Sequence, residues 1–242
     1  MASRRVLITG SAGLVGRSIV PLLPSDWDVT RTDRRPAAGI GALDVTDVDA
    51  CRRAFEGADA VVHLAAVPDP AATWDQLREP NVHGVVAVAQ AAADCRVRRL
   101  VLASSLQAVS APPSTVQRRA VDPPRPANLY GATKAFAEAV GSWLAATSPT
   151  SVVALRIGYF SLTRPGPDVG ARDRAAWLSA RDAAELVRAA VEADIRGLVV
   201  VNGISANRYR AADIDEATTV LGYQPIDDAW AGGPPRRDGV DG

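Results

Sequence analysis

The chain has few of the residues from which metal sites and disulfide frameworks are built. Its 242 residues include only two histidines, His63 and His83, and two cysteines, Cys51 and Cys95. Neither pair has the spacing of a zinc motif, and the cysteines do not form a Cys-x-x-Cys redox pair. We therefore predict a metal-independent protein whose thiols stay reduced, as is typical of the cytoplasm.

Net charge and long apolar runs are also absent. The 27 basic and 27 acidic side chains give a formal net charge of +0, so no broad electrostatic field attracts nucleic acid or an anionic membrane. No segment reaches the roughly 20 apolar residues of a membrane-spanning helix, and the first residues lack the apolar region of a signal peptide. The sequence thus predicts a cytoplasmic localisation, with neither nucleic acid nor a membrane as partner.

Lysine occurs once, at Lys134, in the segment Tyr-Gly-Ala-Thr-Lys that begins at Tyr130. On a helix these two side chains share one face. An ammonium group is a compact charge that guanidinium does not replace, and a phenol beside a fixed cation loses its proton more easily. The pair predicts a tyrosine acid/base whose pKa is lowered by the lysine. The alternative is a tyrosine and a lysine on a solvated helix face.

Strand-like and helix-like segments alternate along most of the chain. We expect strands over residues 5–9, 28–32, 42–45, 60–64, 99–103, 151–157 and 198–201. We expect helices over residues 14–23, 47–55, 76–94, 129–147, 183–193 and 211–220, the fourth of these after a proline-rich loop at 111–128 and the fifth after a polar loop at 163–173. Near-continuous apolar strands in this rhythm predict an α/β fold with a doubly wound parallel sheet, a Rossmann fold.

The domain organisation follows from where this rhythm weakens. Residues 1–158 form the expected dinucleotide-binding core with the catalytic residues, and residues 159–230 form a small C-terminal substrate-binding cap of the same domain. Residues 231–242 are rich in glycine, proline and charge, which predicts a disordered tail.

A glycine-rich turn lies between the first strand and the first helix. Gly10, Gly13 and Gly16 have the spacing GxxGxxG. Such glycines permit a tight turn and a close approach to a pyrophosphate, and the helix N-terminus offers N–H groups to the phosphates. The position directly after an apolar strand favours a dinucleotide site over a glycine-rich turn without a ligand.

Asp33, at the end of the second strand, indicates which dinucleotide is bound. A carboxylate there accepts hydrogen bonds from the adenosine ribose and repels a 2′-phosphate, which favours NAD. Arg31, Arg34 and Arg35 surround it and favour NADP, because guanidinium pairs with phosphate. We predict NAD, with NADP as the less favoured alternative.

Two later strands end in residues that can reach the same ligand. Asp44 and Val45 follow the third strand and can meet the adenine, although Asp44 also suits a solvated turn. Ser104 and Ser105 close the fifth strand, at the sheet edge where ligands of open α/β folds bind. A serine there can hydrogen-bond the substrate oxygen while Tyr130 exchanges its proton.

Together these motifs resemble the extended short-chain dehydrogenases/reductases, the NAD-dependent epimerase/dehydratase family. The segment 63–66 (His-Leu-Ala-Ala) after the fourth strand and Asn81 in the next helix stand in the family's order. Within the family the chain is most similar to the uronate dehydrogenases, through the segments 155–158 (Leu-Arg-Ile-Gly) and 172–179. The resemblance implies oxidation of C1 of a hexuronic acid to an aldarolactone with NAD.

The resemblance also implies a role for each matched residue. Catalysis is assigned to Ser105, Tyr130 and Lys134. Cofactor contacts are implied for Gly10, Ala12, Gly13, Leu14, Val15, Gly16, Asp33, Asp44, Val45, Leu64, Ala65, Ala66, Asn81, Ser104, Tyr130, Lys134 and Ile157. Substrate contacts are implied for Pro68, Ser105, Leu106, Gln107, Tyr159 and Arg172, with the Arg172 guanidinium binding a substrate carboxylate.

Four positions depart from the uronate dehydrogenase pattern. Leu106 and Gln107 replace Asn-His after the catalytic serine, Tyr159 replaces a serine, and Pro68 replaces a polar contact. A sugar hydroxyl left unpaired costs about 1–3 kcal/mol. We therefore predict that the hydride chemistry is kept and that the small-molecule substrate is a smaller or less hydroxylated carboxylate, or another secondary alcohol or ketone.

The same motifs also occur in proteins of this fold that have other functions. A dehydratase has an Asp-Glu pair where this chain has Leu106 and Gln107, so dehydration is disfavoured. An epimerase with tightly bound NAD and a non-catalytic dinucleotide-binding regulator stay open as alternatives. Relatives commonly pair through long helices, here residues 76–94 and 129–147. The many alanines in both permit the close contact of a homodimer, although alanine-rich helix faces occur as readily in monomeric cores.

Overall fold

A seven-stranded parallel sheet organises the molecule. The computed structural model describes residues 3–113 and 115–231. The strands are β1 (Arg4–Thr9), β2 (Trp27–Asp33), β3 (Gly41–Ala42), β4 (Ala60–His63), β5 (Arg99–Ser105), β6 (Ser151–Ile157) and β9 (Leu198–Gly203), and their order in the sheet is β3-β2-β1-β4-β5-β6-β9. The order reverses direction between β1 and β4, which confirms the predicted doubly wound architecture.

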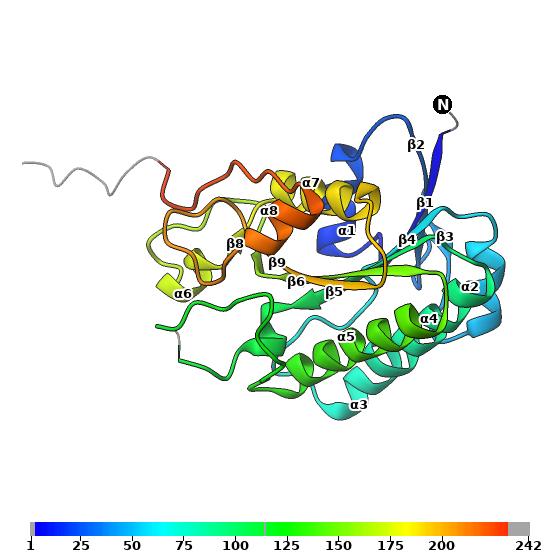
Figure 1. Cartoon of the computed structure of the whole chain (residues 1–242), viewed down its shortest axis with the longest axis horizontal. Helices are drawn as coiled ribbons and strands as arrows, with labels where there is room; N and C mark the ends of the chain where they lie inside the picture. The colour runs from blue at the N-terminus through cyan, green and yellow to red at the C-terminus, as the bar shows by residue number, and fades with distance from the viewer. Residues whose placement is uncertain (1–2, 114, 232–242) are drawn as a thin grey trace, which may run out of the picture.

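Helices cover both faces of this sheet (Figure 1). One face carries α1 (Leu14–Ile19), α7 (Ala180–Glu192) and α8 (Asp215–Leu221), and the other carries α2 (Val48–Phe55), α4 (Gly84–Asp94) and α5 (Leu129–Thr147). Successive strand residues face opposite layers, so Val6 and Ile8 pack into the first core and Leu7 into the second. Burial on both faces explains why the central strands of the sheet have continuous apolar sequences.

Side-chain caps set the starts of three of these helices. Asp47 accepts a hydrogen bond from the Ala50 N–H, Asn128 from Gly131 and Ser179 from Asp182. With Ser179 as its cap, α7 begins at Ala180, three residues earlier than the expected start at residue 183. The Asn128 cap matters most for function, because it fixes the first turn of the helix that carries Tyr130 and Lys134.

Two predicted helices are interrupted at prolines. The helix expected over 76–94 consists of α3 (Trp74–Leu77), a π-helical turn, η2 (Arg78–His83), and α4. Pro80 lies within η2 and has no N–H to donate, which explains the widened turn. The helix expected over 14–23 is α1 followed by a 3₁₀ turn, η1 (Val20–Leu22), that contains Pro21.

Three shorter segments also differ from expectation. The strand predicted over 42–45 is confined to Gly41–Ala42, and the helix predicted over 211–220 begins at Asp215. The polar loop expected over 163–173 gives way to a short helix, α6 (Ala171–Ala175), which carries Arg172.

The residues after 158 serve both the sheet and its ligand-binding edge. β9 pairs with β6, and α7 packs on α1, so these two elements belong to the layers of the main fold. A second small sheet of β7 (Tyr159–Phe160) and β8 (Trp177–Leu178) lies with α6 beyond the carboxyl ends of the main strands (Figure 1). The predicted tail falls, apart from Ala231, outside the described residues. Within residues 3–113 and 115–231, no helix combines the length and apolarity needed to span a bilayer.

Candidate active site

A cavity of about 1530 Å³ runs along the carboxyl edge of the sheet. The turns after β1, β2, β4, β5 and β6 all contribute to its wall. These turns flank the point at which the strand order reverses, and open α/β sheets bind ligands at this crevice.

The glycine-rich turn forms one end of this cavity. Gly10 has φ of +70°, and a Cβ there would lie 2.5 Å from the Ala65 nitrogen, so the fold itself requires a glycine. At Gly13 a Cβ would meet only the Gly10 carbonyl, at 3.1 Å, and Gly13 lines the cavity. Its missing side chain therefore leaves open space beside the start of α1, where a pyrophosphate fits.

Asp33 connects this turn to the end of β2. Its carboxylate accepts hydrogen bonds from the Ala12 N–H at 3.1 Å and the Arg35 N–H at 3.0 Å. Arg34 and Arg35 line the cavity as well. The carboxylate thus helps to shape the turn and still borders the cavity, as an acceptor for ribose hydroxyls would.

Ser105, Tyr130 and Lys134 lie together in the cavity wall. The Tyr130 phenol shares a hydrogen bond with the Ser105 side chain, and the Lys134 Nζ lies 5.6 Å from the centroid of the Tyr130 ring. Lys134 donates to the Ala103 carbonyl at 2.7 Å. The structure therefore brings the three predicted catalytic residues into one cluster that faces the cavity.

The expectation that Lys134 lowers the pKa of Tyr130 is wrong for this structure. Burial raises the pKa of the phenol, and the hydrogen bond from Ser105 offsets only part of this rise. The lysine lies over the ring and donates to a backbone carbonyl, so its charge is not directed at the phenolic oxygen. Burial also lowers the pKa of Lys134 to about 8.

His63 is a neutral structural residue next to this cluster. Its Nδ1 shares a hydrogen bond of 2.8 Å with the Thr9 hydroxyl. Burial, and then the positive charge of Lys134, lower the pKa of the imidazole to about 3. The ring therefore stays uncharged at neutral pH and joins the ends of β4 and β1.

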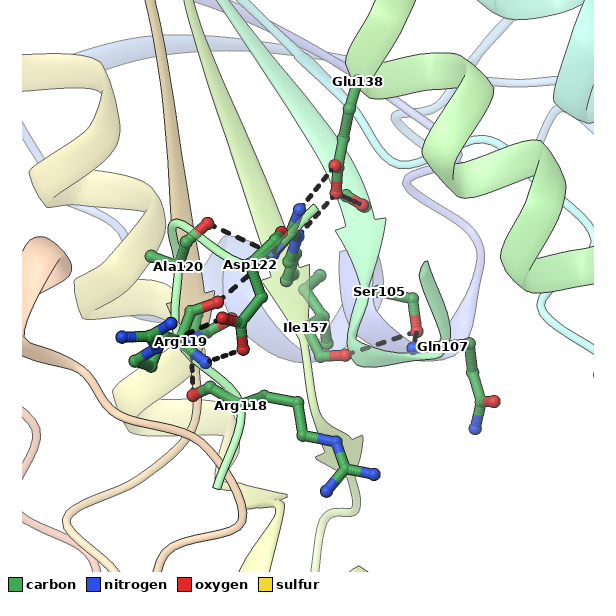
Figure 2. A network of polar contacts seen from close by, with 11 residues as sticks. Ser105, Gln107, Arg118, Arg119, Ala120, Asp122, Glu138 and Ile157 are labelled. Atoms are coloured by element: carbon green, nitrogen blue, oxygen red, sulfur yellow. Dashed lines mark hydrogen bonds and ion pairs between the residues drawn. The ribbon is translucent and has the colours of Figure 1, made fainter. Parts of the chain in front are cut away.

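A buried polar network around Glu138 and Arg156 lies next to the cluster of Ser105, Tyr130 and Lys134 (Figure 2). Glu138 accepts a hydrogen bond from the Ser104 hydroxyl at 2.6 Å and two from the Arg156 guanidinium, both at 2.9 Å. Arg156 also donates to the carbonyls of Ala120 and Asp122, each at 3.2 Å. The network therefore joins α5, β5 and β6 to the segment that leads into the substrate end of the cavity.

The substrate end of the cavity is lined by aromatic and basic side chains. Tyr159 from β7, Arg172 from α6, and Tyr209 and Trp230 from the C-terminal segment all contribute to its wall. The Tyr209 and Trp230 rings meet edge to face at 5.2 Å between centroids. Aromatic rings of this kind pack against the C–H faces of small molecules.

Several residues that line the cavity are not among those predicted from the sequence. Arg118, Tyr209, Arg210 and Trp230 line the cavity, but none of them lies in a motif. Weak signals were present, because Arg118 lies in the long loop before the Tyr130 helix and a tryptophan near a chain end is unusual. Neither signal indicates where the side chain points.

Comparison with known proteins places the chain in a family. Residues 6–164 match the model of the NAD dependent epimerase/dehydratase family. The chain belongs to this family. It is 40% identical to the L-arabinose 1-dehydrogenase (NAD(P)(+)) of Haloferax volcanii, over 93% of this chain and 97% of the relative. It is 35% identical to the NAD-dependent glucose-6-phosphate dehydrogenase of the same organism, over 93% and 94% of the two chains.

A solved structure of the epimerase/dehydratase family is similar over the whole described fold. A mutant of uronate dehydrogenase from Agrobacterium tumefaciens, complexed with NAD, superposes with a TM-score of 0.82 at 27% identity. The match covers 94% of this chain and 86% of the other. The resemblance expected from the motifs is confirmed.

Nearly all of the site residues expected for this family border the cavity, with Asn81 as the exception. The Asn81 side chain is buried and accepts a hydrogen bond from the Val67 N–H at 2.8 Å while donating to the Val67 carbonyl and the Thr133 hydroxyl, each at 3.1 Å. It therefore braces the turn after β4 against α5 and is not among the residues that line the cavity.

Proposed function

We propose that the chain is an NAD-dependent sugar dehydrogenase that takes a hydride from a CH–OH group of a small sugar bearing an acidic group. The observation that carries this proposal is the cluster of Ser105, Tyr130 and Lys134 in a cavity that Arg172 also lines. The chain is an NAD(P)-dependent dehydrogenase acting on sugar CH–OH groups, since its two Haloferax relatives match it over almost their whole lengths.

The walls of the cavity fit a nicotinamide dinucleotide. The open space at Gly13 and the uncapped first turn of α1 suit a pyrophosphate, and Asp33 suits the adenosine ribose. The bound dinucleotide supplies the hydride acceptor. Asp33 supports NAD over NADP, because a second negative charge beside the 2′-phosphate is unfavourable.

The catalytic residues divide the proton chemistry among them. Ser105 donates a hydrogen bond to the substrate oxygen, and Tyr130 takes the proton from that oxygen as the C–H bond breaks. The raised pKa of Tyr130 means that the phenol is protonated at rest, so oxidation requires prior loss of this proton. The Lys134 ammonium lies over the same ring and donates to the Ala103 carbonyl, so its role in the proposal is to bind the nicotinamide ribose and to hold the Tyr130 ring in position.

Arg172 supports a substrate with an acidic group, as the resemblance to uronate dehydrogenases implies. It is exposed on α6 and lines the cavity, so its guanidinium can form a bidentate pair with a carboxylate. Leu106, Gln107 and Tyr159, which depart from the uronate dehydrogenase pattern, line the same cavity. They favour a substrate with fewer hydroxyls to satisfy than a hexuronate.

A turnover assay tests the proposal. Purified protein with NAD and, in turn, L-arabinose, glucose 6-phosphate, glucuronate and galacturonate should form NADH with at least one of these sugars. Tyr130→Phe should reduce kcat by about 10²- to 10⁴-fold, while NAD binding measured by calorimetry stays intact. Absence of NADH with every sugar, together with epimerised product and tightly held cofactor, would support the epimerase instead.

A further inference from the structure

Arg118 brings a second guanidinium to the substrate end of the cavity. It lies between η3 (Leu106–Val109) and α5, and it is 6% exposed yet lines the cavity together with Arg172. In Figure 2 its side chain points away from the buried pair of Glu138 and Arg156. Across residues 3–113 and 115–231, neither Arg118 nor Arg172 forms an ion pair with a carboxylate.

Backbone carbonyls hold the Arg118 guanidinium in place without neutralising it. Its Nε donates to Val109 at 3.4 Å, its Nη1 to Pro113 at 2.9 Å and to Val116, and its Nη2 to Pro112 at 2.5 Å. Four of the five N–H groups are thus used. One N–H of Nη2 has no acceptor among the described residues. The carbonyl groups carry no formal charge, and the Asp122 carboxylate acts on this cation only through space, without an ion pair among the described residues.

The charged side chains at this end of the cavity sum to a positive value. Arg118, Arg172 and Arg210 contribute three positive charges and Asp173 one negative charge, which leaves +2. Burial, and next the charge of Arg172, lower the pKa of Arg118. Two cations that oppose each other in this way are stabilised by an anion bound beside both.

We propose that Arg118 and Arg172 form a subsite for the phosphate group of a phosphorylated sugar. This inference rests on the proposed function and specifies the acidic group of its substrate. A phosphate monoester carries about −1.5 to −2 charges near neutral pH, which matches two guanidinium groups. A carboxylate would leave one of the two unpaired, and a neutral sugar would leave both.

The substrate preference of the wild-type protein provides the first test. We expect kcat/KM for a pentose phosphate such as arabinose 5-phosphate, which has fewer hydroxyls than a hexuronate, to exceed that for arabinose, and that for glucuronate, by about 10- to 100-fold. Inorganic phosphate should inhibit competitively against the sugar and not against NAD. Equal kcat/KM values for the phosphate, the uronate and the neutral sugar would overturn the subsite.

Variants separate recognition of phosphate from bracing of the loop. Arg118→Lys keeps a cation but loses the guanidinium fork, and it should raise KM for the aldose phosphate about 10-fold or more with a smaller change in kcat. KM for the neutral aldose should rise far less than KM for the aldose phosphate. Arg125→Met removes an exposed arginine of the same loop, outside the cavity wall, and should change neither KM. Equal losses for both sugars in Arg118→Lys would indicate a bracing role only and refute the subsite.

Phosphate binding can be measured without turnover. Inorganic phosphate should raise the melting temperature of the wild-type protein and of Arg125→Met, and should have a smaller effect on Arg118→Met or Arg118→Lys. If NADH forms but phosphate stabilises all variants equally, the subsite fails while the dehydrogenase stands. If no sugar is oxidised but stabilisation by phosphate depends on Arg118, the dehydrogenase proposal fails while the phosphate subsite stands.

Discussion

Glu138 and Arg156 form a buried bidentate ion pair that joins the catalytic helix to the strand beside it. The two N–H···O distances are both 2.9 Å, and the side chains are 6% and 2% exposed. Glu138 lies one helical turn after Lys134 and two after Tyr130, on the same face of α5. The pair therefore holds this face of α5 against β6 and, through Ser104, against β5.

Removal of one partner of this pair should be strongly destabilising. In Arg156→Met the Glu138 carboxylate stays buried without its counter-charge, which lowers the free energy of unfolding by about 3–5 kcal/mol. The additional change Glu138→Gln removes the stranded charge and should restore part of that loss. Urea denaturation of the three proteins measures both effects, and a loss below about 1 kcal/mol in the single variant would contradict the prediction.

The choice between NAD and NADP should depend on Asp33. In Asp33→Ser the carboxylate that repels a 2′-phosphate is gone, while Arg34 and Arg35 remain at the cavity wall. The ratio of kcat/KM for NADP to that for NAD should rise by about 10-fold or more, since each 1.4 kcal/mol corresponds to a factor of ten. Steady-state kinetics with both cofactors checks this, and an unchanged ratio would remove Asp33 from the recognition of the ribose.

Lys134 should make stability depend on pH in the alkaline range. Its folded-state pKa is lowered from 10.5 to about 8 by burial, so below pH 8 the charged ammonium opposes folding. As the pH rises from 8 towards 10.5, the folded protein releases this proton while the unfolded chain keeps it, and the opposition disappears. The wild-type protein should therefore gain about 2 kcal/mol relative to Lys134→Met between pH 7.5 and pH 10.

Denaturant titrations of both proteins at several pH values test this difference. Other groups titrate in the same range, but they are common to the two proteins and cancel in the comparison. A difference between wild type and Lys134→Met that stays constant across the range would mean that the pKa of the buried lysine is not lowered.

The outer face of α5 should be the contact between two copies of the chain. Leu129, Phe136 and Trp143 are spaced seven residues apart and are 52%, 39% and 47% exposed, and Ala132 and Ala139 lie exposed between them. This apolar stripe follows one side of the helix, and a second copy offers the same stripe for a symmetric contact.

A double change, Phe136→Glu with Trp143→Glu, should halve the mass measured by light scattering. Arg125→Met, which alters the exposed loop before α5, is the matched control and should leave the mass unchanged. A wild-type protein that is monomeric at micromolar concentration would refute the homodimer.

Local signals explain why much of the site could be predicted. The glycine-rich turn, Asp33 and the paired serines each lie at the carboxyl end of a strand, and parallel strands bring these ends to one edge of the sheet. Tyr130 and Lys134 share a helix face because of their spacing alone. The apolar pattern, by contrast, predicts continuous helices across Pro80 and Pro21. Because these prolines have no N–H group, the structure has a π-helical turn at Pro80 and a 3₁₀ turn at Pro21.

The sequence alone determined the order of strands and helices, the dinucleotide turn and the Ser105, Tyr130 and Lys134 set, because each depends on neighbours within a few residues. Only the tertiary structure decided that Asn81 turns inward, that Arg118 faces the cavity, and that Tyr130 has a raised pKa rather than a lowered one. Burial and side-chain direction depend on the packing of segments far apart in the chain. No local pattern contains that information.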